Sequence, residues 1–327
     1  MVKKIDNMRR IILDFAKQLE IGFESAKYVK AAGQFNKIII CGMGGSSLPG
    51  EILKTWLIGS KVKLPVIIHR DYNLPVETDR QDLVVCVSYS GNTFETLSSF
   101  KDAVERKLNT VAITSGGKLS ELCRKYNAPF AIIPAGAPAR TAVGYQTAAL
   151  LKILINSKVI HDCSKDISTA LANLKPKRLE NQGQKIAKKL KNKTPIVYSS
   201  SQNKSLAYIW KINFNESTKI PAFYNCFPEM NHNELSCFEN AKRFHAIMLR
   251  DREDDPRIFK RMRISADIMK KEGVGALFIN IAGANTFLKI FNNILLSMWA
   301  SYYLAKEYRT DPIILRLQDE MKKRLGN

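Results

Sequence analysis

Short apolar runs rich in β-branched residues recur along the chain, and most are followed by a segment with helical spacing of apolar positions. Such runs indicate buried strands, and strands that alternate with helices form a parallel sheet covered on both faces. In the first half the expected strands are 37–41, 65–69, 83–88, 110–114 and 130–133. The expected helices there are 5–32, 48–57, 93–106, 119–125 and 142–156. This half therefore predicts an α/β fold with a doubly wound parallel sheet.

The second half repeats the layout, with expected strands at 194–198, 244–249 and 275–281 and a basic helix over 314–325. A chain of 327 residues is also longer than one core usually fills. The segment between the halves is more polar and contains Pro176. We therefore expect two doubly wound subdomains related by internal duplication, residues 1–156 and 179–327, joined by a connection over 157–178.

The bulk composition constrains partners and location. The formal net charge is +21 and the pI is about 9.7, which suits anionic ligands, but the basic residues are widely spread. A solvated basic surface is favoured over a nucleic-acid partner. The six cysteines form no CxxC pair, and the N-terminus does not resemble a signal peptide. The longest apolar stretch, 287–304, contains Lys289 and indicates a buried helix, so we expect a cytoplasmic protein without a membrane partner.

A cluster of glycines follows the first expected strand, in the segment Cys41-Gly-Met-Gly-Gly-Ser-Ser47. Glycines here let backbone N–H groups approach a ligand closely, with the start of a helix behind them. The segment matches neither the Walker pattern nor GxGxxG, so a nucleotide site is disfavoured. We take Gly44, Gly45 and Ser46 as candidate binding residues, with an ordinary tight turn as the alternative.

A second turn, Ser88-Tyr-Ser-Gly-Asn-Thr93, also lies between a strand and a helix. Its hydroxyls converge on one helix N-terminus, where hydrogen bonds and the helix dipole can hold a phosphate dianion. One hydroxyl alone would indicate only an N-cap. Three hydroxyls with Gly91 favour an anion site formed by Ser88, Ser90 and Thr93.

These two turns and Ile113-Thr-Ser-Gly-Gly-Lys118 resemble the sugar isomerase (SIS) domain. Further motifs follow in order: Pro138-Ala-Arg140, Phe214-Asn-Glu216, Pro228-Glu-Met-Asn-His232-Asn and Asp311-Pro312…Met321-Lys322. The ordered set, from about Lys37 to the C-terminus, resembles the archaeal-type bifunctional phosphoglucose/phosphomannose isomerases. The resemblance implies an aldose–ketose isomerase of sugar 6-phosphates that needs no metal or other cofactor and acts as a homodimer with shared active sites.

The resemblance also implies roles for four residues. Glu216 carries the proton between C1 and C2, a task that suits a carboxylate. His232 opens the sugar ring from a neighbouring subunit, with Lys322 near by, and Arg140 offsets charge on the enediolate oxygens. Among four histidines, His232 alone lies in a turn-like polar segment, which favours function. The alternatives are that Glu216 is a surface residue at a helix end and that Lys322 is an ordinary exposed lysine.

Other readings remain open. The histidines are scattered and form no HExxH, which disfavours a metal site. Leu315 occupies the place where the family often has a threonine linked to accepting the C2 epimer, which argues against mannose 6-phosphate more than against glucose 6-phosphate. A non-catalytic SIS-type sugar-phosphate sensor is the alternative function. Such a sensor need not retain Glu216, His232 and Arg140 together, and sensors usually carry a DNA-binding segment, of which none is evident before Lys37.

Overall fold

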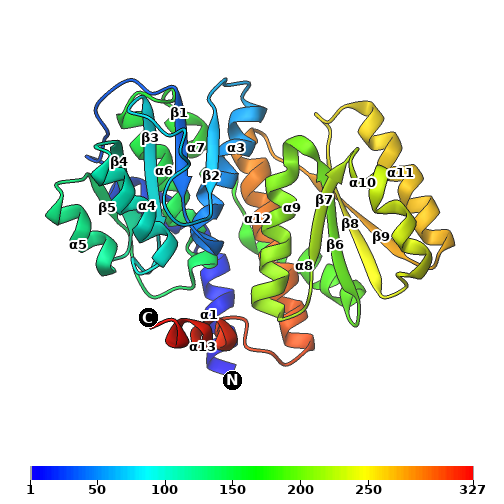
Figure 1. Cartoon of the computed structure of the whole chain (residues 1–327). Helices are drawn as coiled ribbons and strands as arrows, with labels where there is room; N and C mark the ends of the chain where they lie inside the picture. Colours follow the sequence, from blue (N-terminus) through cyan, green and yellow to red (C-terminus); the bar gives the residue numbers. More distant parts are fainter. Residues whose placement is uncertain (1, 327) are drawn as a thin grey trace. The chain divides into compact units, whose positions relative to one another are not determined.

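The computed structural model describes residues 2–326 and forms two α/β units (Figure 1). We call residues 14–165 with 321–326 the N-terminal unit and residues 166–320 with 2–13 the C-terminal unit. The N-terminal segment 2–13 thus belongs to the C-terminal unit, and the C-terminal segment 321–326 belongs to the N-terminal unit. The partition between the units falls within the segment 157–178, in a helix.

The N-terminal unit contains a five-stranded sheet in the order β2-β1-β3-β4-β5, with every neighbouring pair parallel. Its strands are β1 (Lys37–Cys41), β2 (Val66–His69), β3 (Asp82–Ser88), β4 (Asn109–Thr114) and β5 (Phe130–Ile132). Each coincides with an expected strand to within a residue or two. The sequence expectation of a parallel α/β sheet is therefore confirmed for this half.

Helices cover both faces of this sheet. Contacts place α4 (Phe94–Glu105) and α5 (Gly117–Lys125) on the strands of one face, and α3 (Leu48–Gly59) and α6 (Val143–Asn156) on those of the other. The helix α2 (Phe15–Ser25) packs on α6. Successive residues of β1, such as Ile38 and Ile39, are fully buried although they point to opposite faces. Strands buried on both sides explain the continuous apolar runs in the sequence.

The C-terminal unit contains a four-stranded parallel sheet in the order β7-β6-β8-β9. Its strands are β6 (Thr194–Ser200), β7 (Phe223–Phe227), β8 (Phe244–Asp251) and β9 (Gly275–Ile281). Three of them match expected strands, whereas β7 was not expected. Its Phe-Tyr-Asn-Cys-Phe run is interrupted by a polar residue, and as an edge strand it pairs on one side only, with β6.

The described helices of the C-terminal unit pack around its sheet and around one long central helix. They include α1 (Val2–Leu13), α8 (Pro176–Leu190), α9 (Lys204–Asn213), α10 (Met230–Asn233), α11 (Pro256–Lys271) and α12 (Thr286–Glu307). Two further helices, α7 (Ser164–Asn173) and α13 (Arg316–Arg324), span the partition between the units. The helix α12 packs against α8 and α9 and is buried over most of its length, as expected from its apolar sequence. Within residues 2–326, no helix is long and apolar enough to cross a membrane.

Each sheet has a point where the chain reverses the direction in which strands are added. In the N-terminal unit this point lies between β1 and β3, because β1 is flanked by β2 on one side and β3 on the other. In the C-terminal unit it lies between β6 and β8. Parallel α/β sheets bind ligands in the crevice beyond the carboxyl ends of the strands at such points. The functional residues are therefore expected at these two crevices.

Candidate active site

Four loops meet at the carboxyl end of the N-terminal sheet. The loop after β1 accepts a hydrogen bond from the loop after β3, Tyr89 N to Ser46 Oγ, at 3.0 Å. The loop after β4 donates one back, from Ser115 Oγ to the Tyr89 carbonyl, at 2.6 Å. The segment after β5 lies against the glycine loop so closely that a Cβ added to Gly45 would stand 2.3 Å from Arg140 N. The glycine, Ser88–Thr93, Ile113–Lys118 and Pro138–Arg140 motifs of the sequence are therefore parts of one structure.

Three hydroxyls in this cluster each accept a hydrogen bond from within it. Ser46 Oγ accepts from Tyr89 N at 3.0 Å, and Ser90 Oγ accepts from Asn92 N at 3.2 Å. Thr93 Oγ1 accepts from Ser88 Oγ at 2.9 Å. Among residues 2–326, none of the three hydroxyls donates its own proton to a protein acceptor. A hydroxyl that accepts from its own loop still has a proton to donate, which suits an anionic ligand.

The Ser88 hydroxyl has a different position from these three. Ser88 is fully buried, and its Oγ both donates to Thr93 Oγ1 and accepts from Thr93 N, at 3.4 Å. It thereby fixes the residue at the N-terminus of α4, the helix whose dipole favours an anion. The Ser88 hydroxyl therefore orients Thr93.

Glycine at position 91 is required by both conformation and space. Gly91 has φ +71°, in the left-handed region. A Cβ at this position would stand 1.8 Å from the Gly116 carbonyl oxygen of the loop after β4. The turn can therefore pack against the neighbouring loop only with glycine at position 91.

Arg140 lies on a 3₁₀ turn, Ala139–Thr141, that follows β5 and precedes α6. Its residue exposure is only 2%, so the cation is held inside the protein. The turn is fixed by Gln146 Nε2, which donates to the Ala139 carbonyl at 2.9 Å, and by Thr141 Oγ1, which donates to the Pro138 carbonyl at 2.9 Å. A buried guanidinium on an anchored turn can act as a fixed positive charge.

In the C-terminal unit, Glu216 lies on a π-helical turn, Phe214–Thr218, that continues α9. Such turns are rare and are frequently found at functional sites. The side chain of Glu216 is half-buried, between the fully buried Phe214 and Ser217. The turn ends at Lys219, whose φ of +61° is left-handed and stops the helix.

A column of polar residues on α12 anchors the helix that carries Glu216. Trp210 Nε1 donates to Asn293 Oδ1 and Asn213 Nδ2 donates to Ser297 Oγ, both at 2.7 Å. One turn further on, Thr218 Oγ1 donates to the Ser301 carbonyl at 3.1 Å. These three contacts, all buried, fix both the end of α9 and the π-helical turn in the C-terminal unit.

His232 and Lys322 are both exposed. His232 lies on the short helix α10, directly after β7 and the cis Phe227–Pro228 bond. Its neighbour Glu234 is fixed, because its carboxylate accepts from Tyr198 Oη at 2.7 Å and from Asn225 Nδ2 at 2.6 Å. Burial, reinforced by the Glu234 carboxylate, raises the pKa of Tyr198. The Glu234 carboxylate is therefore used in structural hydrogen bonds. The exposed imidazole of His232 is accessible to a partner subunit or a ligand.

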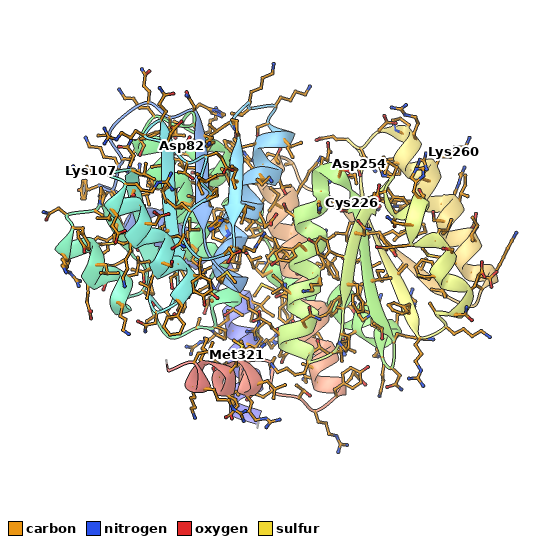
Figure 2. The ribbon with its side chains drawn as sticks, in the orientation of Figure 1. Asp82, Lys107, Cys226, Asp254, Lys260 and Met321 are labelled. Carbon is orange, nitrogen blue, oxygen red and sulfur yellow. The ribbon has the colours of Figure 1, made fainter. Side chains whose placement is uncertain are left out.

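The matching crevice of the C-terminal unit is acidic. Asp254, labelled in Figure 2, accepts from Asn203 Nδ2 at 3.2 Å and from Asp251 N at 3.1 Å. Lys289 Nζ lies 2.9 Å from Asp251 Oδ1. Burial raises the pKa of Asp254 despite these hydrogen bonds. The loop after β6 also carries hydroxyls, but Ser200 hydrogen-bonds to Asp254. The carboxylates make this crevice less suited to an anion than the crevice of the N-terminal unit.

Several contributors to the site were not identified from the sequence. Tyr89, Ser115 and Gln146 hold the loops together through hydrogen bonds to backbone groups, and a single sequence carries no pattern that reveals such bonds. The one available signal was the bulky Tyr89 in a turn otherwise made of small residues. Among the described residues, no group of three His, Cys, Asp or Glu side chains is close enough to hold a metal ion.

Comparison with known proteins agrees with this architecture. Residues 34–156 match the SIS domain family, and residues 179–325 match the family described as bacterial phospho-glucose isomerase C-terminal SIS domain. A crystal structure of a hypothetical protein from Thermus thermophilus superposes with a TM-score of 0.70 at 14% identity, over 99% of this chain and 94% of that one, which shows the shared fold. The fold and the loop cluster thus define a protein of two SIS domains.

Two curated relatives show which family of SIS-domain proteins this is. A bifunctional phosphoglucose/phosphomannose isomerase from Caldicellulosiruptor bescii is 36% identical over 324 residues, 95% of each chain. One of the same name from Aquifex aeolicus is 32% identical over 309 residues, 92% of this chain and 95% of that one. The chain belongs to the bifunctional phosphoglucose/phosphomannose isomerase family. This confirms the expected resemblance and favours the isomerase over the non-catalytic sensor.

Proposed function

We propose that the protein interconverts glucose 6-phosphate and fructose 6-phosphate, with mannose 6-phosphate as a second aldose substrate. The observation that carries the proposal is the set of three hydroxyls, Ser46, Ser90 and Thr93, each of which accepts a hydrogen bond and keeps its own proton for a ligand. Ser90 and Thr93 lie just before the N-terminus of α4, and Ser46 belongs to the neighbouring glycine loop. Such a cradle suits the phosphate dianion at C6.

The remaining residues would carry the reaction. His232, supplied by a partner subunit with Lys322 near by, assists ring opening. The Glu216 carboxylate then removes the C2 proton of the open-chain aldose, which leaves a cis-enediolate. A proton passes from O2 to O1, and Glu216 returns its proton to C1 to give the ketose. Arg140 stabilises the negative charge on the enediolate oxygens throughout.

A coupled assay tests the proposal directly. Purified protein is expected to convert fructose 6-phosphate to glucose 6-phosphate, detected through a dehydrogenase specific for glucose 6-phosphate, without added metal and with EDTA present. A parallel assay with mannose 6-phosphate tests the second aldose, which the names of the relatives support and Leu315 argues against. If the protein binds fructose 6-phosphate but turns over neither sugar, it is a sensor and the proposal fails.

The homodimer with shared sites, and a cytoplasmic location, remain predictions. Mixing two inactive variants tests the shared site. If His232 acts across subunits, refolding Glu216→Gln protein together with His232→Ala protein creates heterodimers with one intact site each, and roughly a quarter of the parental activity returns. If His232 acts within its own subunit, no mixture recovers activity. Each variant refolded alone is the control.

A further inference from the structure

Tyr89 lies at the centre of the loop cluster without being one of the expected site residues. The residue is buried, with 7% of its surface exposed. Its phenol donates a hydrogen bond to the Pro134 carbonyl at 2.9 Å and accepts one from Ala137 N at 3.0 Å. Both partners belong to the segment that runs from β5 to Arg140.

That segment has no polar side chain of its own with which to hold its shape. Residues 134–139 are Pro-Ala-Gly-Ala-Pro-Ala, and Gly136 adopts a left-handed φ of +101°. Gln146 fixes the far end through the Ala139 carbonyl. Between Pro134 and Ala137, the Tyr89 phenol makes two hydrogen bonds to the backbone. The phenol therefore supplies the near anchor of the Arg140 segment.

The backbone of the same residue belongs to the anion cradle. Tyr89 N donates to Ser46 Oγ, and its carbonyl accepts from both Ser115 Oγ, at 2.6 Å, and Ser115 N, at 3.0 Å. One residue thus joins the hydroxyls that suit a phosphate to the segment that carries the guanidinium. Contacts of this kind fix the distance between two functional groups more strictly than either loop could alone.

We propose that Tyr89 is a positioning residue that sets Arg140 relative to the phosphate cradle, so that the cation lies at the enediolate oxygens when the phosphate is bound. This proposal rests on the proposed role of Arg140. Burial raises the pKa of Tyr89, which keeps the phenol protonated and able to donate. The anchor is therefore present over the whole pH range of an isomerase assay.

Tyr89→Phe removes the hydroxyl and keeps the ring, and Tyr126→Phe, at an exposed tyrosine of the same unit, is the matched control. We expect kcat to fall roughly tenfold in Tyr89→Phe while the dissociation constant for inorganic phosphate stays within about twofold, since the cradle hydroxyls are untouched. A purely structural role would lower the melting temperature and leave kcat per folded molecule unchanged. Equal loss of phosphate affinity and kcat would place the effect in the cradle and contradict the proposal.

A double-mutant cycle tests whether the effect passes through Arg140. In an Arg140→Lys background, Tyr89→Phe is expected to lower kcat little further, because the group it positions is already lost. If the double variant loses kcat by the product of the two single losses, Tyr89 and Arg140 act independently and the proposal is overturned. Hydrogen exchange separates this outcome from failure of the isomerase function. Amides of residues 134–141 should exchange faster in Tyr89→Phe whether or not the parent turns over sugar, and unchanged exchange would refute the anchor itself.

Discussion

Replacing Glu216 with glutamine is expected to lower kcat by about three orders of magnitude while the affinity for fructose 6-phosphate stays within a few-fold. The amide is nearly isosteric with the carboxylate but cannot accept and return a proton. The π-helical turn should persist, because buried hydrogen bonds from Asn213 and Thr218 hold it against α12. Steady-state kinetics together with calorimetric titration of the sugar phosphate would measure both quantities.

A matched control is Glu239→Gln, at an exposed glutamate in the same unit, which should leave kcat and affinity unchanged. Exchange of the C2 proton with deuterated solvent gives an independent readout, because a variant without the base should lose exchange along with turnover. If Glu216→Gln retains parental kcat, the base is another residue. If it loses affinity and kcat alike, Glu216 binds the substrate and does not carry its proton.

The strands of both sheets were the features most readily predicted from the sequence. Runs such as Ile38-Ile39-Ile40 are apolar on both faces because helices cover both faces of the sheet. The strand β7 was missed because its run contains Asn225, whose amide is used to bind Glu234. The π-helical turn at Glu216 was missed as well, since it depends on contacts with α12, some 80 residues further along the chain.

The sequence predicted that the candidate site binds an anion, but not the role of each residue in it. Glycine and hydroxyl clusters after two strands indicated an anion site, because parallel strands bring their carboxyl ends to one edge. Which hydroxyls keep a proton to donate could not be predicted. Ser88, a candidate binding residue, is buried and donates its proton to Thr93, and this hydrogen bond forms only in the folded loop. The anchoring role of Tyr89 depends on its approach to Pro134, 45 residues away.

Replacing Gly91 with alanine is expected to weaken phosphate binding strongly and to destabilise the N-terminal unit. Two effects combine. An alanine at φ +71° costs about 1 kcal/mol in backbone strain. Its Cβ would also stand 1.8 Å from the Gly116 carbonyl oxygen, so one of the two loops must move. Together we expect a loss of roughly 3 kcal/mol in unfolding free energy and at least about a hundredfold weaker phosphate binding.

Gly273→Ala separates the two effects. Gly273 has a similar φ of +77°, but a Cβ added there meets nothing within 4 Å. The Gly273→Ala variant should therefore lose only the backbone strain, about 1 kcal/mol of unfolding free energy, and bind phosphate as the parent does. Urea unfolding and phosphate titration of both variants give the comparison. If Gly91→Ala behaves like Gly273→Ala, the turn tolerates displacement from its neighbour. The close packing of the loops after β3 and β4 would then not be what shapes the anion cradle.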